Sequence, residues 1–142
     1  MTDTEYMRRA LELAGRGVGW TSPNPMVGAV VVKDGRVIGE GFHERCGEAH
    51  AERNALAHCT ESPAGATMYV TLEPCPMCAG AISQARLGKL VFGAFDEERG
   101  CAGSLYRICE DPAFPWFTPS VGGVLEGECK ALLDVFFQRA RR

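Results

Sequence analysis

The sequence predicts an α/β fold built on a mixed β-sheet, and two observations lead to that class. Two β-rich runs, residues 26–32 and 36–42, flank Lys33-Asp34-Gly35, and an Asp-Gly pair between such runs is a strong hairpin signal. Further along the chain, strand-like and helix-like segments alternate, which requires the right-handed crossovers that join parallel strands. An antiparallel hairpin combined with parallel strands gives a mixed sheet with helices packed on its faces.

The first predicted element is an amphipathic helix over residues 4–14. Apolar side chains recur there at helical spacing, behind Thr4 as a candidate N-terminal cap. Gly15, Gly17 and Gly19 then end the helix before the hairpin begins.

The middle of the chain alternates between helix and strand. Residues 49–58 and 76–86 are rich in helix formers, and residues 66–72 and 89–95 are β-rich. The crossovers between these strands place the helices against the sheet.

The C-terminal third combines a long segment and a closing helix. Residues 96–120 hold glycine, proline, acids and aromatics without a clear period, so we expect a long ordered loop that can include a short helix. Loops of this length are often functional. Residues 128–140 predict an amphipathic helix. The side chains expected on its buried side are Leu132, Leu133, Phe136 and Phe137.

Size and composition are those of an ordinary globular domain. The chain has 142 residues, 46% of them hydrophobic and 23% charged, so we expect residues 1–142 to form one domain with a substantial core. No apolar run is long enough to cross a bilayer, and the N-terminus does not resemble a secretory signal. The expected location is the cytoplasm, without a membrane partner.

Net charge and cysteine count narrow the possible functions. A net charge of −3 and a pI of 5.6 provide no general attraction for a phosphate backbone. Seven cysteines cannot all pair within one chain, and in the cytoplasm most thiols stay reduced. Some of the cysteines must therefore be free thiols or metal ligands.

Two cysteines lie three residues apart in the stretch TLEPCPMCAG, residues 71–80. Cys75 directly follows a predicted strand, and Cys78 lies one turn into the next helix, so both sulfurs can face one point near a helix N-terminus, where thiolate is favoured. Upstream, His50 and Glu52 stand at the start of another predicted helix. His-x-Glu followed by Pro-Cys-x-x-Cys is the pattern of zinc deaminases.

Hydrolytic deamination explains why these residue types are needed. A zinc ion with three protein ligands keeps a fourth position for a water whose pKa it lowers to about 7. His50, Cys75 and Cys78 are the predicted Zn²⁺ ligands. Glu52 is the predicted catalytic residue, which takes the proton of the water and delivers it to the ring and to the leaving amine.

Two other interpretations of the cysteine pair remain open from the residues alone. Cys-x-x-Cys also occurs as a redox pair in α/β proteins. A structural zinc would need a fourth ligand, for which the candidates are Cys46, Cys59 and Cys101. Cys109 and Cys129 are expected to pack as small apolar side chains, as is Cys59 if it binds no metal.

With these residues in place, the whole chain resembles the cytidine deaminase-like superfamily. The resemblance implies a three-layer α/β/α sandwich around a five-stranded mixed sheet, hydrolytic removal of an exocyclic amine, and usually an oligomer, here expected to be a homodimer.

Residues 7–57 are similar to the pyrimidine deaminase domain of the riboflavin biosynthesis enzyme, through MRRALELAGRGVGWTSPNPMVGAVVV, GEGFH and CGEAHAERNAL. That similarity implies that Asn24 and His43 help to hold an aminopyrimidine. The alternatives are that SPNP is simply turn chemistry and that His43 simply ends a strand.

Residues 66–137 are similar instead to bacterial tRNA adenosine deaminase, including the short spacing between the cysteines. That family has an asparagine where this chain has His43, and a polar segment where this chain reads FPWF. Trp116 and Phe117 could stack on a base. The alternative is that Phe114, Trp116 and Phe117 form a hydrophobic lid. The favoured substrate is a small nucleobase-like molecule, and the alternative is adenosine in tRNA or in another single-stranded nucleic acid.

Overall fold

The computed structural model describes residues 2–17 and 25–140, with side chains to residue 135. The elements are α1 (Asp3–Gly15), β1 (Gly28–Lys33), β2 (Arg36–Phe42), α2 (Ala51–Ala57), β3 (Thr67–Leu72), α3 (Pro76–Gln84), β4 (Lys89–Ala94), the short 3₁₀ helix η1 (Ile108–Glu110), β5 (Ser120–Val121) and α4 (Glu126–Ala140).

The sheet is mixed and five-stranded, as predicted. Its order is β2-β1-β3-β4-β5, with β1 antiparallel to both β2 and β3, and with β3, β4 and β5 parallel. Asp34 and Gly35 have φ of 52° and 73°, the left-handed conformations that a tight two-residue hairpin requires. The parallel half of the sheet brings the C-terminal ends of β3 and β4 side by side, and these ends frame the candidate site.

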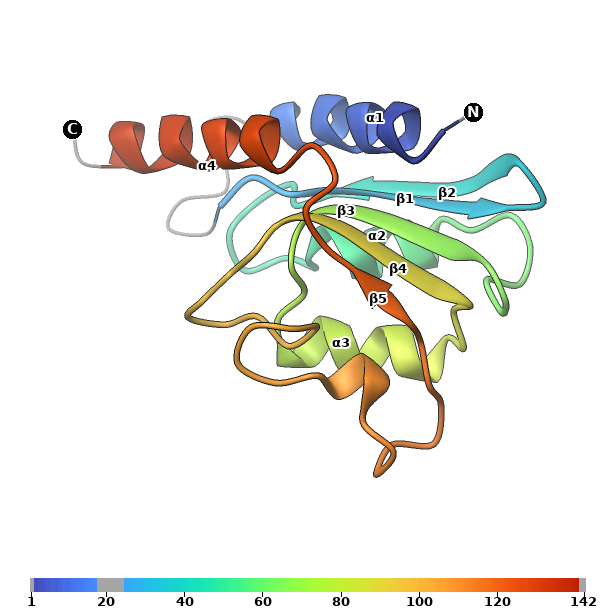
Figure 1. The fold of residues 1–142 in the computed structure, drawn as a ribbon. Coiled ribbons are helices and arrows are strands. Elements are labelled where there is room, and N and C mark those ends of the chain that lie inside the picture. The colour runs from blue at the N-terminus through green and yellow to red at the C-terminus, as the bar shows by residue number, and fades with distance from the viewer. Residues whose placement is uncertain (1, 18–24, 141–142) are drawn as a thin grey trace.

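Helices cover both faces of the sheet, which completes the three-layer sandwich (Figure 1). One apolar cluster joins α1, α4 and the sheet, and a second joins α2 and α3 to the opposite face. Helix α2 lies very close to β2, since a Cβ added at Gly41 would be 2.4 Å from the backbone nitrogen of Ala55. This close packing holds the N-terminal end of α2 near the sheet edge where the site forms.

Several predicted boundaries were wrong. The cap of α1 is Thr2, whose hydroxyl accepts from the Glu5 N–H at 3.3 Å, so Thr4 is not the cap. Residues 96–120 contain the short helix η1, which the sequence allowed, and also the first residue of β5, which was not predicted. The last helix begins at Glu126 rather than at residue 128, which places two acids in its first turn, where the helix dipole favours them.

Part of α4 and all seven cysteines lie within the described residues, so the predictions for them can be compared with the structure. Leu133 packs against the apolar cluster as predicted, whereas the side chains of Phe136 and Phe137 lie outside the described residues. None of the seven cysteines, all of which lie in the described residues, forms a disulfide, and Cys109 and Cys129 are buried in the core as predicted. Across residues 2–17 and 25–140, no helix has the length and apolar character needed to span a bilayer.

Candidate active site

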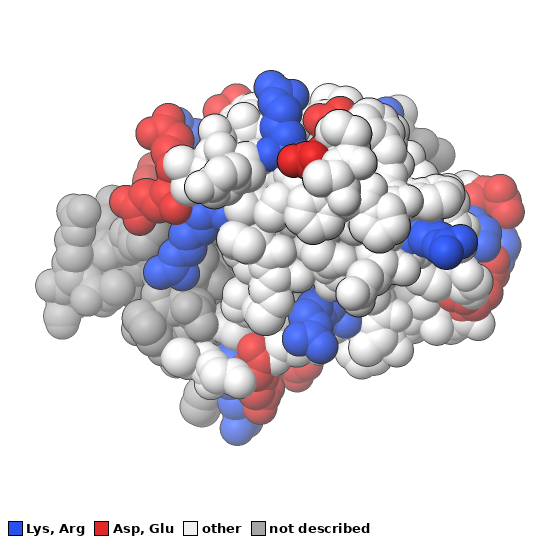
Figure 2. Space-filling view, turned by 90° about the horizontal axis from the view of Figure 1, so that it is seen from below, with Lys and Arg blue, Asp and Glu red and all other residues white. Residues whose placement is uncertain are grey.

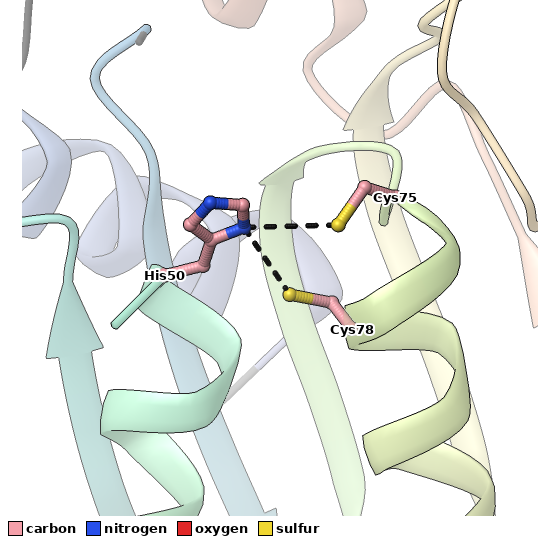
Figure 3. Close-up of side chains that lie close together, drawn as sticks. All are labelled: His50, Cys75 and Cys78. Carbon is pink, nitrogen blue, oxygen red and sulfur yellow. Dashed lines mark hydrogen bonds between the residues drawn. The ribbon is translucent and has the colours of Figure 1, made fainter. Parts of the chain in front are cut away.

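Two helix N-termini converge at the candidate metal site, as the sequence predicted. His50 is the N-cap of α2, one residue before the first turn in which it was expected, and Cys75 is the N-cap of α3. Neither side chain caps its own helix with a hydrogen bond, so both project beyond the helix ends. Figure 3 shows the His50 ring and the sulfurs of Cys75 and Cys78 pointing toward one another.

The separations between the three side chains are those of metal ligands. The Nδ1 atom of His50 lies 3.7 Å from the sulfur of Cys75 and 3.5 Å from that of Cys78. Zinc held tetrahedrally at ~2.3 Å from sulfur and ~2.0 Å from nitrogen places a nitrogen and a sulfur ligand ~3.5 Å apart. Both nitrogen–sulfur separations are therefore close to those of a zinc tetrahedron, and all three donor atoms lie within 4.8 Å of one another.

No fourth protein ligand joins this group among the described residues. In this part of the chain, His50, Cys75 and Cys78 are the only group of three or more His, Cys, Asp or Glu donors that lie within 4.8 Å of one another. Cys46, Cys59 and Cys101 are not part of it, so the structural four-ligand zinc is contradicted for the described part of the chain. Catalytic zinc sites have three protein ligands and a fourth coordination position that is open to water or substrate.

The two thiols are suited to hold a cation. With protein groups alone, the hydrogen bond from Cys78 lowers the pKa of Cys75 to about 5, and the same bond raises the pKa of Cys78. One proton is thus shared between two sulfurs at a helix N-terminus. A divalent metal replaces such a proton and takes both sulfurs as thiolates.

Glu52 is buried beside this group, in the first turn of α2, and is only 4% exposed. Burial raises the pKa of its carboxyl group from 4.5 to about 7, because desolvation disfavours the charged form. A carboxyl group with this pKa can both accept and return a proton near neutral pH, which is what a general acid and base requires.

A pocket of about 60 Å³ opens beside the ligands, and His50, Glu52 and Cys75 line it. The other polar residues in its lining are His43, Glu73, Asp96 and Arg99. The structure therefore brings four of the predicted site residues, His43 included, to one cavity, with Cys78 buried just behind it.

His43 is held firmly in that lining. Its Nδ1 lies 3.1 Å from the Ala49 carbonyl oxygen, and its ring meets the His50 ring edge to face, with 5.3 Å between centroids. The Asn54 amide donates to the same carbonyl at 3.2 Å and to the Phe42 carbonyl at 2.8 Å, which ties the 43–49 loop to α2. His43 thus both follows β2 and faces the pocket. Its expected companion Asn24 lies outside the described residues.

The predicted lid residues are not at this pocket. Trp116 donates its indole N–H to the Leu87 carbonyl at 2.9 Å, and Arg86 lies 5.7 Å from its ring centroid. Phe114 and Trp116 line a separate groove along the outer face of α3, and Phe117 is 58% exposed. This placement does not support a lid over the metal site.

One residue of the site was missed by the sequence argument. Glu73 is 2% exposed, lines the pocket and stands two residues before Cys75. Its position between a strand and the Pro-Cys pair was the available signal, because a carboxylate there has to be buried with partners.

Comparison with known proteins identifies what this architecture is similar to. Residues 1–94 match the family model described as the cytidine and deoxycytidylate deaminase zinc-binding region. A diaminohydroxyphosphoribosylamino-pyrimidine deaminase from Buchnera aphidicola is 42% identical over 147 residues, covering 99% of this chain and 97% of that protein. A tRNA-specific adenosine deaminase from Bacillus subtilis is 39% identical over 152 residues, covering 100% of this chain and 93% of that protein.

Longer relatives match over only part of their length. The riboflavin biosynthesis protein RibD of Actinobacillus pleuropneumoniae is 44% identical over 96% of this chain, which spans 37% of that protein. Among solved structures, RibD of Acinetobacter baumannii superposes with a TM-score of 0.83 and 36% identity over 96% of this chain and 39% of that one. A chain from structural work on A-to-I editing by tRNA:A34 deaminases gives a TM-score of 0.78 and 38% identity over 92% of this chain and 99% of that one.

Proposed function

The chain belongs to the family of the cytidine and deoxycytidylate deaminase zinc-binding region, and on that premise we propose that it removes an exocyclic amino group, as ammonia, from a nucleobase-like ring. The observation that carries the proposal is the convergence of His50, Cys75 and Cys78 at tetrahedral ligand distances beside the buried Glu52. The matched family and this donor set agree on Zn²⁺ as the cofactor.

In the proposed mechanism each protein group has one task. His50, Cys75 and Cys78 would hold a Zn²⁺ ion, which would supply a Lewis acid that lowers the pKa of water to about 7. Glu52 accepts a proton from the attacking water, transfers it to a ring nitrogen, and later helps to protonate the leaving amine. Its burial and its pKa of about 7 support both directions of transfer.

The substrate we propose is a small aminopyrimidine, specifically a diaminohydroxyphosphoribosylaminopyrimidine. The Buchnera aphidicola relative that is named for this substrate matches along nearly its whole length, and His43 lines the pocket where the riboflavin-type resemblance requires it. The charge distribution also favours a small substrate over a nucleic acid. On the face seen in Figure 2, basic side chains are scattered among acidic ones and form no continuous patch for a phosphate backbone.

Adenosine in tRNA is the second candidate, and a specific observation favours it. Only two residues separate Cys75 from Cys78, the short spacing that resembles tRNA adenosine deaminase. The Bacillus subtilis relative named for that activity also matches along most of its length.

One experiment separates the two substrates. Zinc-loaded protein is incubated with the phosphoribosylaminopyrimidine and, separately, with an anticodon stem-loop that carries a wobble adenosine, and ammonia is followed in both. We expect ammonia from the pyrimidine alone. Inosine in the RNA would show instead that the second candidate, adenosine in tRNA, is the substrate. If neither substrate released ammonia while zinc stayed bound, the proposed deaminase function would be wrong.

We also propose that the protein is a homodimer in the cytoplasm. Figure 2 shows a broad uncharged area on the face that carries α3 and the segment after β4. Exposed apolar side chains of these segments are Met77, Phe95, Leu105, Tyr106, Phe114 and Phe117. Such a patch is typical of an interface. Seven cysteines with no disulfide among them suit a reducing compartment. Sedimentation analysis would test the dimer, which a monomer at micromolar concentration would contradict.

A further inference from the structure

The carboxylate of Glu73 accepts four hydrogen bonds from one segment of the chain. One oxygen accepts from the Asp96 N–H at 3.0 Å and from the Ser104 hydroxyl, and the other accepts from the N–H groups of Ala102 at 3.1 Å and Ser104 at 2.8 Å. These donors span residues 96–104, which the structure leaves without helix or strand. A single buried side chain thus fastens a nine-residue loop.

We propose that Glu73 is a positioning residue, which holds residues 96–104 in place as one wall of the substrate pocket. The proposal rests on the function proposed above, and it assigns to Glu73 a role in substrate binding that acts through the loop rather than by contact with the reacting atoms.

The backbone around Glu73 joins this loop to the metal site. Cys101 donates its N–H to the Pro74 carbonyl at 2.8 Å, so the loop is bonded to the residue directly before the ligand Cys75. Gly100 lies against the carboxylate, because a Cβ added there would be 2.3 Å from the Glu73 carboxyl carbon. Close contact and hydrogen bonds together fix the distance between the loop and the ligand.

The loop presents two charged residues to the pocket. Asp96 and Arg99 both line it, opposite the N-terminal end of α2. One oxygen of Asp96 accepts from the N–H groups of Glu98 and Arg99, each at 3.1 Å, which sets the local turn. The guanidinium group of Arg99 has no ion pair within the described part of the chain, so it can bind a substrate group. The position of Arg99 in the pocket therefore depends on the hydrogen bonds that Glu73 accepts from this loop.

The same hydrogen bonds argue against a catalytic role for Glu73. An ionised carboxylate offers about four acceptor sites, and the four donors of the loop fill them. No acceptor site of Glu73 is left to face the attacking water, and the proposed mechanism assigns the proton transfer to Glu52.

The test compares Glu73→Gln with Glu40→Gln as a matched control. The amide of Glu73→Gln keeps the shape of the side chain but turns two acceptor sites into donors, which oppose the N–H groups of the loop. Glu40 is a partly buried glutamate that accepts from Arg9 at 2.6 Å and 3.1 Å, outside the pocket lining. Zinc content, kcat and KM are measured with whichever proposed substrate is turned over, together with amide hydrogen exchange over residues 96–104.

For Glu73→Gln we expect full zinc content, faster exchange across residues 96–104, and a KM raised about tenfold to a hundredfold with kcat changed by less than about threefold. Ser104→Ala, which removes one of the four donors, should raise KM by about threefold to tenfold. Glu40→Gln should change none of these values.

An unchanged KM in a folded, zinc-loaded Glu73→Gln protein would overturn the proposal, even if exchange became faster, because Glu73 would then only stabilise the loop. If Glu73→Gln does not fold, Ser104→Ala replaces it in the test: unchanged KM or unchanged hydrogen exchange across residues 96–104 in that variant would overturn the proposal. The exchange measurement needs no substrate: unchanged exchange overturns the anchoring role whether or not either substrate is deaminated. Failure to deaminate both substrates contradicts the proposed function separately.

Discussion

Replacing Glu52 by glutamine tests the proposed chemistry with the least change of shape. The side chain is buried beside the ligands, and its carboxyl has a pKa of about 7 because of burial. Glutamine fits the same space but cannot carry a proton between water and the ring. Since proton transfer by a positioned group contributes about 10²- to 10⁴-fold to a rate, kcat should fall by about that factor.

The same pKa predicts an effect on stability that needs no substrate. The folded protein holds the Glu52 proton more tightly than the unfolded chain does, so this stabilisation is complete below pH 4.5 and is lost as the pH rises through about 7. A change from 4.5 to about 7 corresponds to about 3 kcal/mol. Metal-free Glu52→Gln should therefore be more stable than the metal-free wild-type protein at pH 8, and the advantage should disappear near pH 4.

The assay for this variant has three parts: ammonia release, zinc per chain by atomic absorption, and urea denaturation of the metal-free protein at pH 4 and pH 8. Glu48→Gln is the control, because Glu48 is exposed and lies two residues before His50 but outside the pocket lining. We expect Glu52→Gln to keep its zinc and Glu48→Gln to match the wild type throughout. Ammonia release by Glu52→Gln at close to the wild-type rate would refute the assignment of Glu52.

Three further outcomes are expected. Cys78→Ser should bind less than one zinc per chain and lose activity, because a hydroxyl is a poor replacement for a thiolate ligand; full zinc content in that variant would exclude Cys78 as a ligand. Dialysis against a chelator should abolish ammonia release, and added Zn²⁺ should restore it, whereas activity that survives complete zinc removal would contradict the metal's role. Gly41→Ala should lower the free energy of unfolding by about 1–3 kcal/mol, because its Cβ would meet the α2 backbone. Gly15→Ala is the control and should not lower the free energy of unfolding, because no atom lies within 4 Å of the added Cβ. Equal free energies of unfolding for Gly41→Ala and Gly15→Ala would contradict the close packing of α2 on β2.

The candidate metal ligands could be predicted because their signals are local. Cys75 and Cys78 are three residues apart at a strand-to-helix junction, and His50 and Glu52 stand together at a helix start, so each pair is placed by its own element. Only the meeting of the two helix ends is a tertiary fact, and the alternation of strands and helices implies it.

The role of Glu73 could not be predicted in that way. Its hydrogen-bond donors lie 23 to 31 residues further along the chain, in a segment without periodicity, and no local pattern joins them to the carboxylate. Strand β5 was missed for a related reason, because two residues are too few to show alternation. Phe114 and Trp116 were expected at the pocket because aromatic residues in a loop suit a lid, but packing along α3 decides their place.

X-ray absorption at the zinc edge tests the central claim most directly, because it counts the ligands of the bound metal. We predict two sulfur atoms at ~2.3 Å and two nitrogen or oxygen atoms at ~2.0 Å, one from His50 and one from water. Three or more sulfur ligands, or a second histidine in place of water, would contradict it, because zinc would then have no position left for the reacting water.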